Sequence, residues 1–248
     1  MSKHTPPGNW WTRQQALGVG RPAIRSACAK PGDAILIVTE GTVTEQVYFK
    51  LVRNDLKLAT VTVAIHPGDH SDARHVVKTA EKKVNDLARR ARKGRLAMNE
   101  PSKYDHVYAV VDTDVDLRNG RWNEVVQFAT ARKVLLAESS PCFETWLLFH
   151  LVGPTTRSDL PNGDAAKAAV KKALGCAYST NEKVAEKVLP IFIPLWPAAV
   201  KAAETVRNSH ASAGTASPAN PSTEVDRLIC VMNDSAQPLH RKLPIATP

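Results

Sequence analysis

Acidic side chains follow two apolar segments of this sequence, in positions suited to metal chemistry. Glu40 comes two positions after the apolar run at residues 34–38, and Asp112 and Asp114 follow the end of the run at residues 106–111. Short runs rich in β-branched residues predict strands that are buried on both faces of a parallel sheet. If the two strands are neighbours, their carboxyl ends meet at one edge of the sheet and the three carboxylates converge there.

Converging carboxylates repel one another unless a cation joins them. Hard divalent ions with oxygen ligands, usually Mg²⁺, resolve this repulsion, and two Asp residues separated by one position are suited to holding such an ion from a turn. We therefore predict a magnesium site formed by Glu40, Asp112 and Asp114, with Mn²⁺ as a substitute ion. Taken singly, Glu-Gly and Asp-x-Asp pairs are also common at solvated turns, and it is their order along the chain that favours a site.

The elements that must position these residues alternate between strands and helices. Strands are predicted at residues 34–38, 61–65, 106–111 and 133–137, and helices begin near Thr44, Asp72 and Arg121. This alternation predicts an α/β fold with a mainly parallel, Rossmann-like sheet flanked by helices. Residues 66–69 are expected to form a loop and residues 112–116 a turn, and we expect Asp116 and Glu138 to be exposed turn residues.

Beyond Pro141 the pattern becomes helical. Helices are predicted at residues 143–151, 164–174, 182–189 and 198–207, and a last helix is capped by residues 222–224, with no strand expected in this part. We therefore divide the chain into a basic N-terminal arm (1–32), an α/β domain (33–150) and a C-terminal helical extension (151–248). The arm contains Trp10 and Trp11, for which stacking on nucleotide bases and packing against the domain are both open.

The chain is basic, with 33 Lys and Arg against 24 Asp and Glu and a net charge of +9. This balance favours polyanionic partners, although a basic surface without a ligand is about as common. The predicted helix after Asp72 carries an apolar face and an opposite basic stripe, formed by Arg74, Lys78, Lys82, Arg89 and Arg92. We expect this stripe to bind the phosphate backbone of nucleic acid without reading its sequence.

Several other classes of protein lack support in the sequence. No apolar run approaches the roughly 20 residues needed to span a bilayer, no signal-peptide stretch occurs, and the four cysteines are far apart, so we expect a cytoplasmic protein with reduced thiols. The nucleophile elbow of hydrolases and the phosphate-binding loop of nucleotide hydrolases do not occur. His66, His70 and His75 do not share one helical face, which disfavours zinc. His150, on an apolar helix, is typical of a core histidine.

The order of these elements resembles the Toprim fold, which primases, topoisomerases and nucleases of the overcoming-lysogenization-defect type share. Four segments are also similar to the RloB-like family of phage-defence proteins: residues 35–49, 110–114, 139–150 and 220–223. The chain departs from the family pattern at Ser140, where Asn is usual, and at Thr39, where Cys is common. Neither departure removes a carboxylate.

The resemblance implies a Mg²⁺-dependent Toprim nuclease that cleaves phosphodiester bonds in antiphage defence or abortive infection. RNA, with transfer RNA as the first guess, is favoured over DNA. Glu40 matches the Toprim glutamate that acts as general acid or base or as a metal ligand, and Asp112 and Asp114 match the metal-binding pair. Glu45 matches a second N-terminal carboxylate that completes the metal shell or activates water. Glu144 is either a catalytic carboxylate turned toward this cluster or a charge favoured at a helix N-terminus, and the resemblance favours the first.

The resemblance also implies an RloA-type ATPase as a partner, and it leaves a homo-oligomer open. The alternative to a nuclease is a non-catalytic binding or sensor subunit of an ATPase defence complex, in which the acidic cluster is structural.

Overall fold

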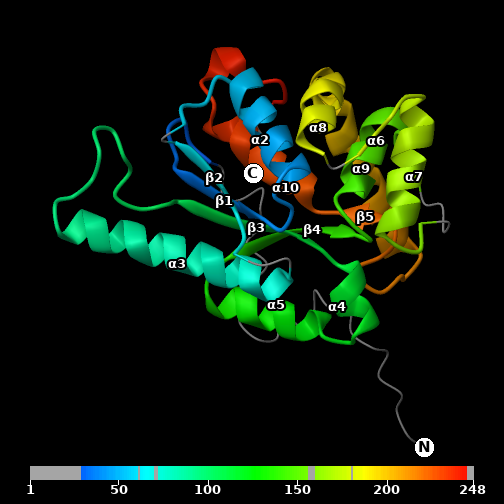
Figure 1. Cartoon of the computed structure of the whole chain (residues 1–248), viewed down its shortest axis with the longest axis horizontal. Coiled ribbons are helices and arrows are strands. Elements are labelled where there is room, and N and C mark those ends of the chain that lie inside the picture. Colours follow the sequence, from blue (N-terminus) through cyan, green and yellow to red (C-terminus); the bar gives the residue numbers. More distant parts are fainter. Residues whose placement is uncertain (1–28, 61, 70–71, 156–159, 180, 245–248) are drawn as a thin grey trace, which may run out of the picture.

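Four parallel strands form the centre of the protein, and a short fifth strand closes one edge (Figure 1). The computed structural model describes residues 29–60, 62–69, 72–155, 160–179 and 181–244, so most of the predicted basic arm, including Trp10 and Trp11, lies outside the described residues. The strands are β1 (Ile35–Thr39), β2 (Val63–Pro67), β3 (His106–Asp112), β4 (Leu135–Ser140) and β5 (Ser222–Thr223), in the spatial order β2-β1-β3-β4-β5. Strand β5 runs antiparallel to β4.

Helices cover both faces of the sheet. One face carries α2 (Thr44–Asp55), α6 (Glu144–Val152), α7 (Gly163–Leu174), α8 (Glu182–Val188), α9 (Trp196–Ser212) and α10 (Val225–Ser235), and the other carries α3 (Ala73–Arg92) and α5 (Trp122–Ala131) (Figure 1). A short helix, α4 (Asp114–Arg118), follows β3, and two 3₁₀ turns, η1 (Leu189–Leu195) and η2 (Pro238–His240), join the C-terminal elements. Within the described residues, none of the helices has both the length and the apolar character needed to cross a membrane.

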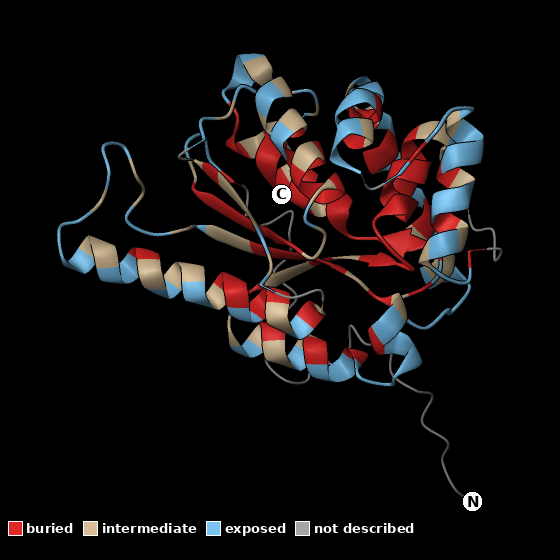
Figure 2. Cartoon of the chain, viewed as in Figure 1, coloured by how far each residue is buried: buried red, intermediate tan, exposed pale blue. Residues whose placement is uncertain are grey.

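Alternate side chains of each strand enter two different cores. Ile35 and Ile37 pack with α2 and the C-terminal helices, whereas Leu36 and Val38 pack with α3 and α5 (Figure 2). This alternation follows from the pleat of a strand covered on both faces, and it explains why β1 is apolar at every position. The C-terminal helices share a hydrophobic core with β1 and α2, for Trp196 of α9 and Ile229 of α10 belong to the same buried cluster as Ile37.

The predicted α/β fold with a mainly parallel sheet and C-terminal helices is confirmed, with local corrections. Residues His66 and Pro67 belong to the end of β2, not to a loop, because β2 is an edge strand that tolerates a proline. Residues 114–118 form a helix, not a turn, and two acidic residues in its first turn favour it through the helix dipole. The prediction of no strand after Pro141 was wrong: residues 222–223 pair with Ser139 and Ser140 of β4. A two-residue strand has too little alternation to be visible in a sequence.

Candidate functional site

The strand order places a topological switch point between the carboxyl ends of β1 and β3. The chain leaves β1 toward β2 on one side, and it leaves β3 toward β4 on the other. At such a switch point the helices that follow the two strands lie on opposite faces of the sheet, which opens a crevice where α/β proteins bind ligands. Glu40 directly follows β1 and Asp112 ends β3, so both predicted acidic segments lie at this point.

Glu40 and Asp112 are in direct contact. The backbone N–H of Asp112 donates a hydrogen bond to Oε2 of Glu40 over 3.1 Å, and the backbone N–H of Glu40 donates to the carbonyl of Val110 over 3.0 Å. Burial raises the pKa of Glu40 to about 7, the bond from Asp112 opposes this rise, and the nearby charges of Glu45, Asp116 and Asp114 add to it. Glu40 therefore carries a carboxyl group that titrates near neutral pH in the absence of a cation.

The Asp112 side chain points toward the start of α6. Its Oδ1 atom accepts a hydrogen bond from the backbone N–H of Phe143 over 2.9 Å. Burial raises the pKa of Asp112 well above its usual value, and the charges of Glu40, Glu45 and Glu144 raise it further. Six carboxylates thus take part in these interactions at the sheet edge, and the meeting of Glu40 with Asp112 is as expected from the sequence.

Glu45 lies behind Glu40, in the first turn of α2. Its side chain is 7% exposed, and its Oε1 atom accepts a hydrogen bond from the backbone N–H of Gly41 over 3.0 Å. A β-carbon at position 41 would lie only 2.0 Å from Oε2 of Glu45, so the Glu45 carboxylate can occupy this position only because residue 41 is glycine. Burial raises the pKa of Glu45 to about 7, with Glu144 adding to the rise and Lys167 of α7 opposing it.

Glu144 is buried at the N-terminus of α6 and belongs to the same cluster. Its two carboxylate oxygens accept hydrogen bonds from the Tyr178 hydroxyl over 3.1 Å and from the Cys142 thiol over 3.0 Å. Both descriptions offered by the sequence hold for its position, since Glu144 begins a helix and also faces Asp112 and Glu45. Sequence reasoning missed Tyr178, which lies in the loop between α7 and α8 and belongs to no motif.

Asp114 and Asp116 occupy different sides of α4. A β-carbon on Gly163 would lie 3.8 Å from Oδ2 of Asp114, so this half-buried carboxylate faces the start of α7. Asp116, expected to be an exposed turn residue, is instead 6% exposed and forms an ion pair with Arg121 over 3.3 Å. Glu138 was also expected in an exposed turn, but it lies half-buried within β4.

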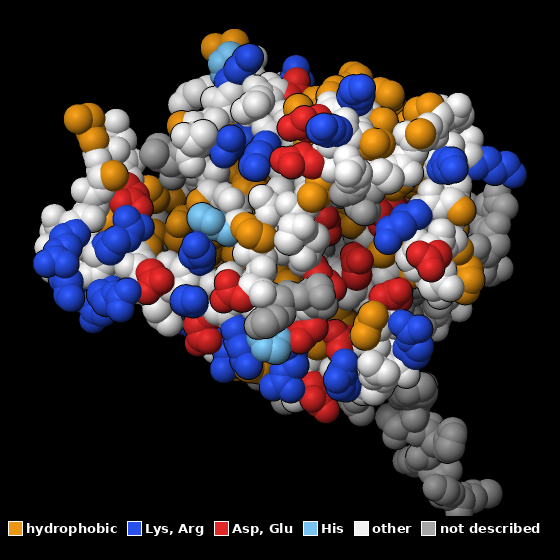
Figure 3. Space-filling model, viewed as in Figure 1, with side chains coloured by type: hydrophobic (Ala, Val, Ile, Leu, Met, Phe, Trp, Pro, Cys, Tyr) orange, Lys and Arg blue, Asp and Glu red, His pale blue; other side chains and the backbone are white. Residues whose placement is uncertain are grey.

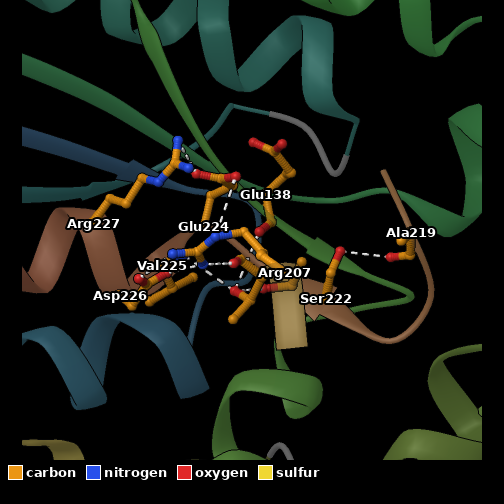
Figure 4. A network of polar contacts seen from close by, with 10 residues as sticks. Glu138, Arg207, Ala219, Ser222, Glu224, Val225, Asp226 and Arg227 are labelled. Carbon is orange, nitrogen blue, oxygen red and sulfur yellow. Dashed lines mark hydrogen bonds and ion pairs between the residues drawn. The ribbon is translucent and has the colours of Figure 1, made fainter. Parts of the chain in front are cut away.

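A second polar cluster holds β5 against β4, and its central residue, Arg207 of α9, was not singled out from the sequence (Figure 4). Arg207 donates to both carboxylate oxygens of Asp226, each over 2.6 Å, and to the carbonyl of Thr223 over 2.5 Å. The Ser139 and Thr223 hydroxyls are hydrogen-bonded over 2.8 Å, and the backbone N–H of Glu224 donates to the Glu138 carbonyl. Residues 139–150 and 220–223, which are far apart in sequence, therefore meet at this strand pair.

The residues at the sheet edge fit a hard divalent cation by charge and by donor type. The cluster offers only carboxylate oxygens, and the fully buried Thr113 hydroxyl between Asp112 and Asp114 has no hydrogen-bond partner in the described part of the chain. As placed among the described residues, however, no three His, Cys, Asp or Glu side chains form a group that could hold a metal ion. Glu40, Asp112, Glu45 and Glu144 each accept an internal hydrogen bond.

The predicted basic stripe lies on the outer face of α3, and its members differ in their partners. Arg74 pairs with Glu124 over 3.4 Å, Lys82 with Asp69 over 3.6 Å and Arg89 with Asp86 over 2.8 Å. Lys78 and Arg92 are exposed, and no ion pair to either occurs among the described residues. Because exposed ion pairs contribute little, all five cations remain candidates for contacts with phosphate.

The fold and this geometry define a Rossmann-like α/β protein with an acidic cluster at the switch point of its sheet. The comparison with protein families specifies the class further: the RloB-like protein family matches residues 35–232, and the chain belongs to this family. Comparisons with curated proteins and with solved structures found no match.

Proposed function

We propose that this protein is a Toprim-type, Mg²⁺-dependent nuclease that cleaves nucleic acid phosphodiester bonds in antiphage defence. The observation that supports this proposal best is the contact between Glu40 and Asp112, which joins two acidic segments separated by 71 residues of chain at the sheet's switch point. Membership of the RloB-like family agrees with a role in defence. RNA, and transfer RNA in particular, is the favoured substrate by analogy with related defence effectors.

The cluster has an outer and an inner part that suit different roles. Glu40, Asp112 and Asp114 are half-buried, whereas Glu45 and Glu144 are buried. The outer three are the proposed ligands of Mg²⁺ or Mn²⁺. A divalent cation bound there would polarise the scissile phosphate and neutralise charge on the leaving oxygen.

One carboxylate from each part of the cluster is suited to proton transfer. Glu40 and Glu45 both titrate near pH 7, the range in which a carboxylate accepts a proton from water and returns it efficiently. We assign water activation to one of these two residues. Glu144, fixed by hydrogen bonds from Tyr178 and Cys142, helps to raise the pKa of Asp112 and of Glu45.

The second candidate function is a non-catalytic binding or sensor subunit of a complex with an RloA-type ATPase. One observation favours it: Glu40, Asp112, Glu45 and Glu144 are already satisfied by internal hydrogen bonds, as in a structural cluster. Against it, burial and the charges of neighbouring carboxylates raise the pKa values of Glu40 and Asp112, and a structural cluster gains nothing from buried carboxylates whose ionisation is opposed in this way. Association into a homo-oligomer is compatible with either function.

The test is cleavage of total RNA and of plasmid DNA by the purified full-length chain, with Mg²⁺, with Mn²⁺ and with a chelator, read on one gel. We expect cleavage only with a divalent ion, RNA to be cut in preference to DNA, and the Asp112→Ala variant to be inactive. Adding the ATPase tests whether a partner is required. Cleavage that persists unchanged in Asp112→Ala sinks the nuclease mechanism. Absence of both cleavage and calorimetric binding of Mg²⁺ or Mn²⁺, even with the ATPase, favours the binding subunit.

A further inference from the structure

The C-terminal half of α3 extends away from the sheet and ends in an exposed basic tip. Residues 89–105, here called the distal arm, comprise the last turn of α3 and the loop that returns to β3 (Figure 1). Figure 3 shows Lys and Arg side chains gathered at this end of the molecule. Arg92, Lys93 and Arg95 are all exposed, and no acidic partner within ion-pair distance of any of them occurs among the described residues.

The distal arm is held together by its own contacts, so that its free cations are presented on an ordered support. Arg90 forms an ion pair with Glu100, and the Glu100 carboxylate also accepts from the backbone N–H of Ala97 over 2.9 Å. The backbone N–H of Arg95 donates to the Arg90 carbonyl over 2.9 Å. One arginine is thus used to fold the loop back onto the helix, and the three neighbouring cations remain directed at solvent.

The distal arm and the acidic cluster lie near opposite ends of α3. The turn before α3 touches the end of β1, because the backbone N–H of Gly68 donates to the Thr39 carbonyl next to Glu40 over 2.8 Å. From there α3 runs for 20 residues toward the opposite edge of the sheet, a length of roughly 30 Å. Lys78 and Lys82 of the basic stripe lie between the two ends.

We infer that the distal arm grips the phosphate backbone of a nucleic acid duplex whose other end reaches the acidic cluster. This inference rests on the proposed function and adds to it the class of substrate, a nucleic acid with a helical stem. Roughly 30 Å corresponds to about nine base pairs of B-form DNA at 3.4 Å per base step, and to a somewhat longer stem of A-form RNA, whose rise per base pair is shorter. The arm fixes the distance from the end of the stem to the cut, and it reads backbone position, not base sequence.

Two observations favour a duplex over a single strand. Proteins that hold single strands combine a basic groove with aromatic side chains on which bases stack. Within residues 89–105, all of which are described, the one aromatic residue, Tyr104, is half-buried against the α3–α5 core, and the exposed large apolar residue is Met98. A duplex is also stiff far beyond this scale, so cations at two ends of a 30 Å surface engage it together without ordering a flexible chain.

The experiment compares binding of two fluorescent RNA hairpins that share a loop but have stems of about 14 and about 5 base pairs. Fluorescence anisotropy is measured with chelator present, on the full-length chain, on the triple variant Arg92→Gln, Lys93→Gln, Arg95→Gln, and on the control variant Lys183→Gln, Lys187→Gln, Lys201→Gln. The control removes the same charge from exposed lysines of α8 and α9 on the opposite face. We expect the arm variant to bind the long stem roughly tenfold or more weakly, with a logarithmic salt slope smaller by about 2–3, and the short stem and the control to change little.

Three results would overturn the inference. The first is that the arm variant binds the long stem as tightly as the control variant does, which is also expected if the tip binds an acidic protein instead. The second is that the arm variant loses affinity equally for both stems, which would show a general charge effect. The third is that it loses the same affinity for an unpaired strand as long as the long hairpin, which would show that the duplex is not what the arm binds. Failure of the proposed function is separate: stem-length-dependent binding through the arm, with no cleavage under any metal condition, leaves the inference intact and refutes the nuclease.

Discussion

The backbone N–H of Asp112 lies 3.1 Å from Oε2 of Glu40, while the carboxylate of the same aspartate accepts a hydrogen bond from the backbone of Phe143. One residue therefore ties the end of β1, the end of β3 and the start of α6 together. Its charge lies where burial and neighbouring carboxylates oppose ionisation. A group held in this way contributes less to stability than a neutral isostere does, which is common for residues retained for function.

Replacement of Asp112 by Asn should abolish cleavage and at the same time stabilise the metal-free protein. The amide keeps an oxygen for the Phe143 bond and removes one charge from the cluster. We expect cleavage to fall at least about 100-fold. The melting temperature in chelator should rise by about 2–4 °C, the equivalent of roughly 1 kcal/mol for a chain of this size. Gel-based cleavage and calorimetric melting measure the two effects.

The same variant separates the two proposed functions, because added Mg²⁺ should raise the melting temperature of the parent chain more than that of Asp112→Asn. Equal shifts for both proteins, or loss of stability in the variant without metal, contradict the placement of Asp112 in a cation site. A structural cluster predicts the second of these results.

Replacement of Gly41 by Ala should disrupt the site while the fold remains intact. The new β-carbon would lie 2.0 Å from Oε2 of Glu45, so the carboxylate must leave its bond to the Gly41 N–H. We expect a loss of roughly 10- to 100-fold in cleavage rate with a small change in melting temperature, because the displaced group is a side chain and not the core.

Gly163→Ala is the matched control for that change. Its β-carbon would meet Cys142 Sγ at 3.5 Å and Oδ2 of Asp114 at 3.8 Å, both ordinary contacts that displace neither group, and the position is the first residue of α7, where alanine is a better helix former. Comparable rates for the two variants would show that the position of the Glu45 carboxylate does not matter for cleavage.

The sequence was sufficient to predict the α/β fold and the meeting of Glu40 with Asp112. Both follow from short-range signals: apolar runs of strand length, and acidic residues immediately after them. Parallel pairing of consecutive βα units then brings the strand ends together without further information. Residue propensities alone gave two wrong local predictions. Pro67 ends the edge strand β2 where a loop was predicted, and residues 114–118 form helix α4 where a turn was predicted.

The residues behind the cluster could not be predicted in the same way. Tyr178 reaches Glu144 from a loop 34 positions further along the chain, and Arg207 joins Thr223 and Asp226 from the preceding helix. These contacts depend on how the C-terminal helices pack against the sheet. The spacing of apolar residues along the sequence predicts each helix but not this packing. Asp116 was expected in solvent because an Asp after a strand end is usual in turns, whereas α4 turns it inward toward Arg121.

Arg207→Met should strongly destabilise the protein. Asp226 is 3% exposed, and the change would leave its carboxylate buried without the two bonds from the guanidinium. Loss of one partner of a buried ion pair costs about 3–5 kcal/mol. Urea denaturation should show this loss, and the double variant Arg207→Met, Asp226→Asn should recover part of it because no buried charge remains. A double variant as unstable as the single one would show that the lost bond to Thr223, not the orphaned charge, dominates.

His150 should make the protein less stable as the pH falls from about 6.5 to about 4. Its Nδ1–H donates to the Trp146 carbonyl over 2.8 Å, and its Nε2 accepts from the Tyr48 hydroxyl over 3.0 Å, as expected for a core histidine. Burial lowers the pKa of His150 from 6.5 to about 4, with the Trp146 carbonyl opposing the shift. Between these two values the unfolded chain binds a proton that the folded chain does not, so the free energy of unfolding falls on acidification, by up to about 3 kcal/mol from this group.

The variant His150→Gln isolates that contribution, because glutamine also hydrogen-bonds to Tyr48 but does not titrate. At pH 7.5 the variant should be less stable than the parent chain, since it packs less well against the surrounding aromatic rings. On acidification only the parent chain loses the contribution of a buried neutral imidazole. The difference in free energy of unfolding between the parent chain and the variant, measured by urea denaturation, should therefore be smaller by about 2–3 kcal/mol at pH 4.5 than at pH 7.5. If this difference in free energy of unfolding stayed constant from pH 7.5 to pH 4.5, His150 would be protonated equally in the folded and the unfolded chain, which its two hydrogen bonds and its burial do not allow.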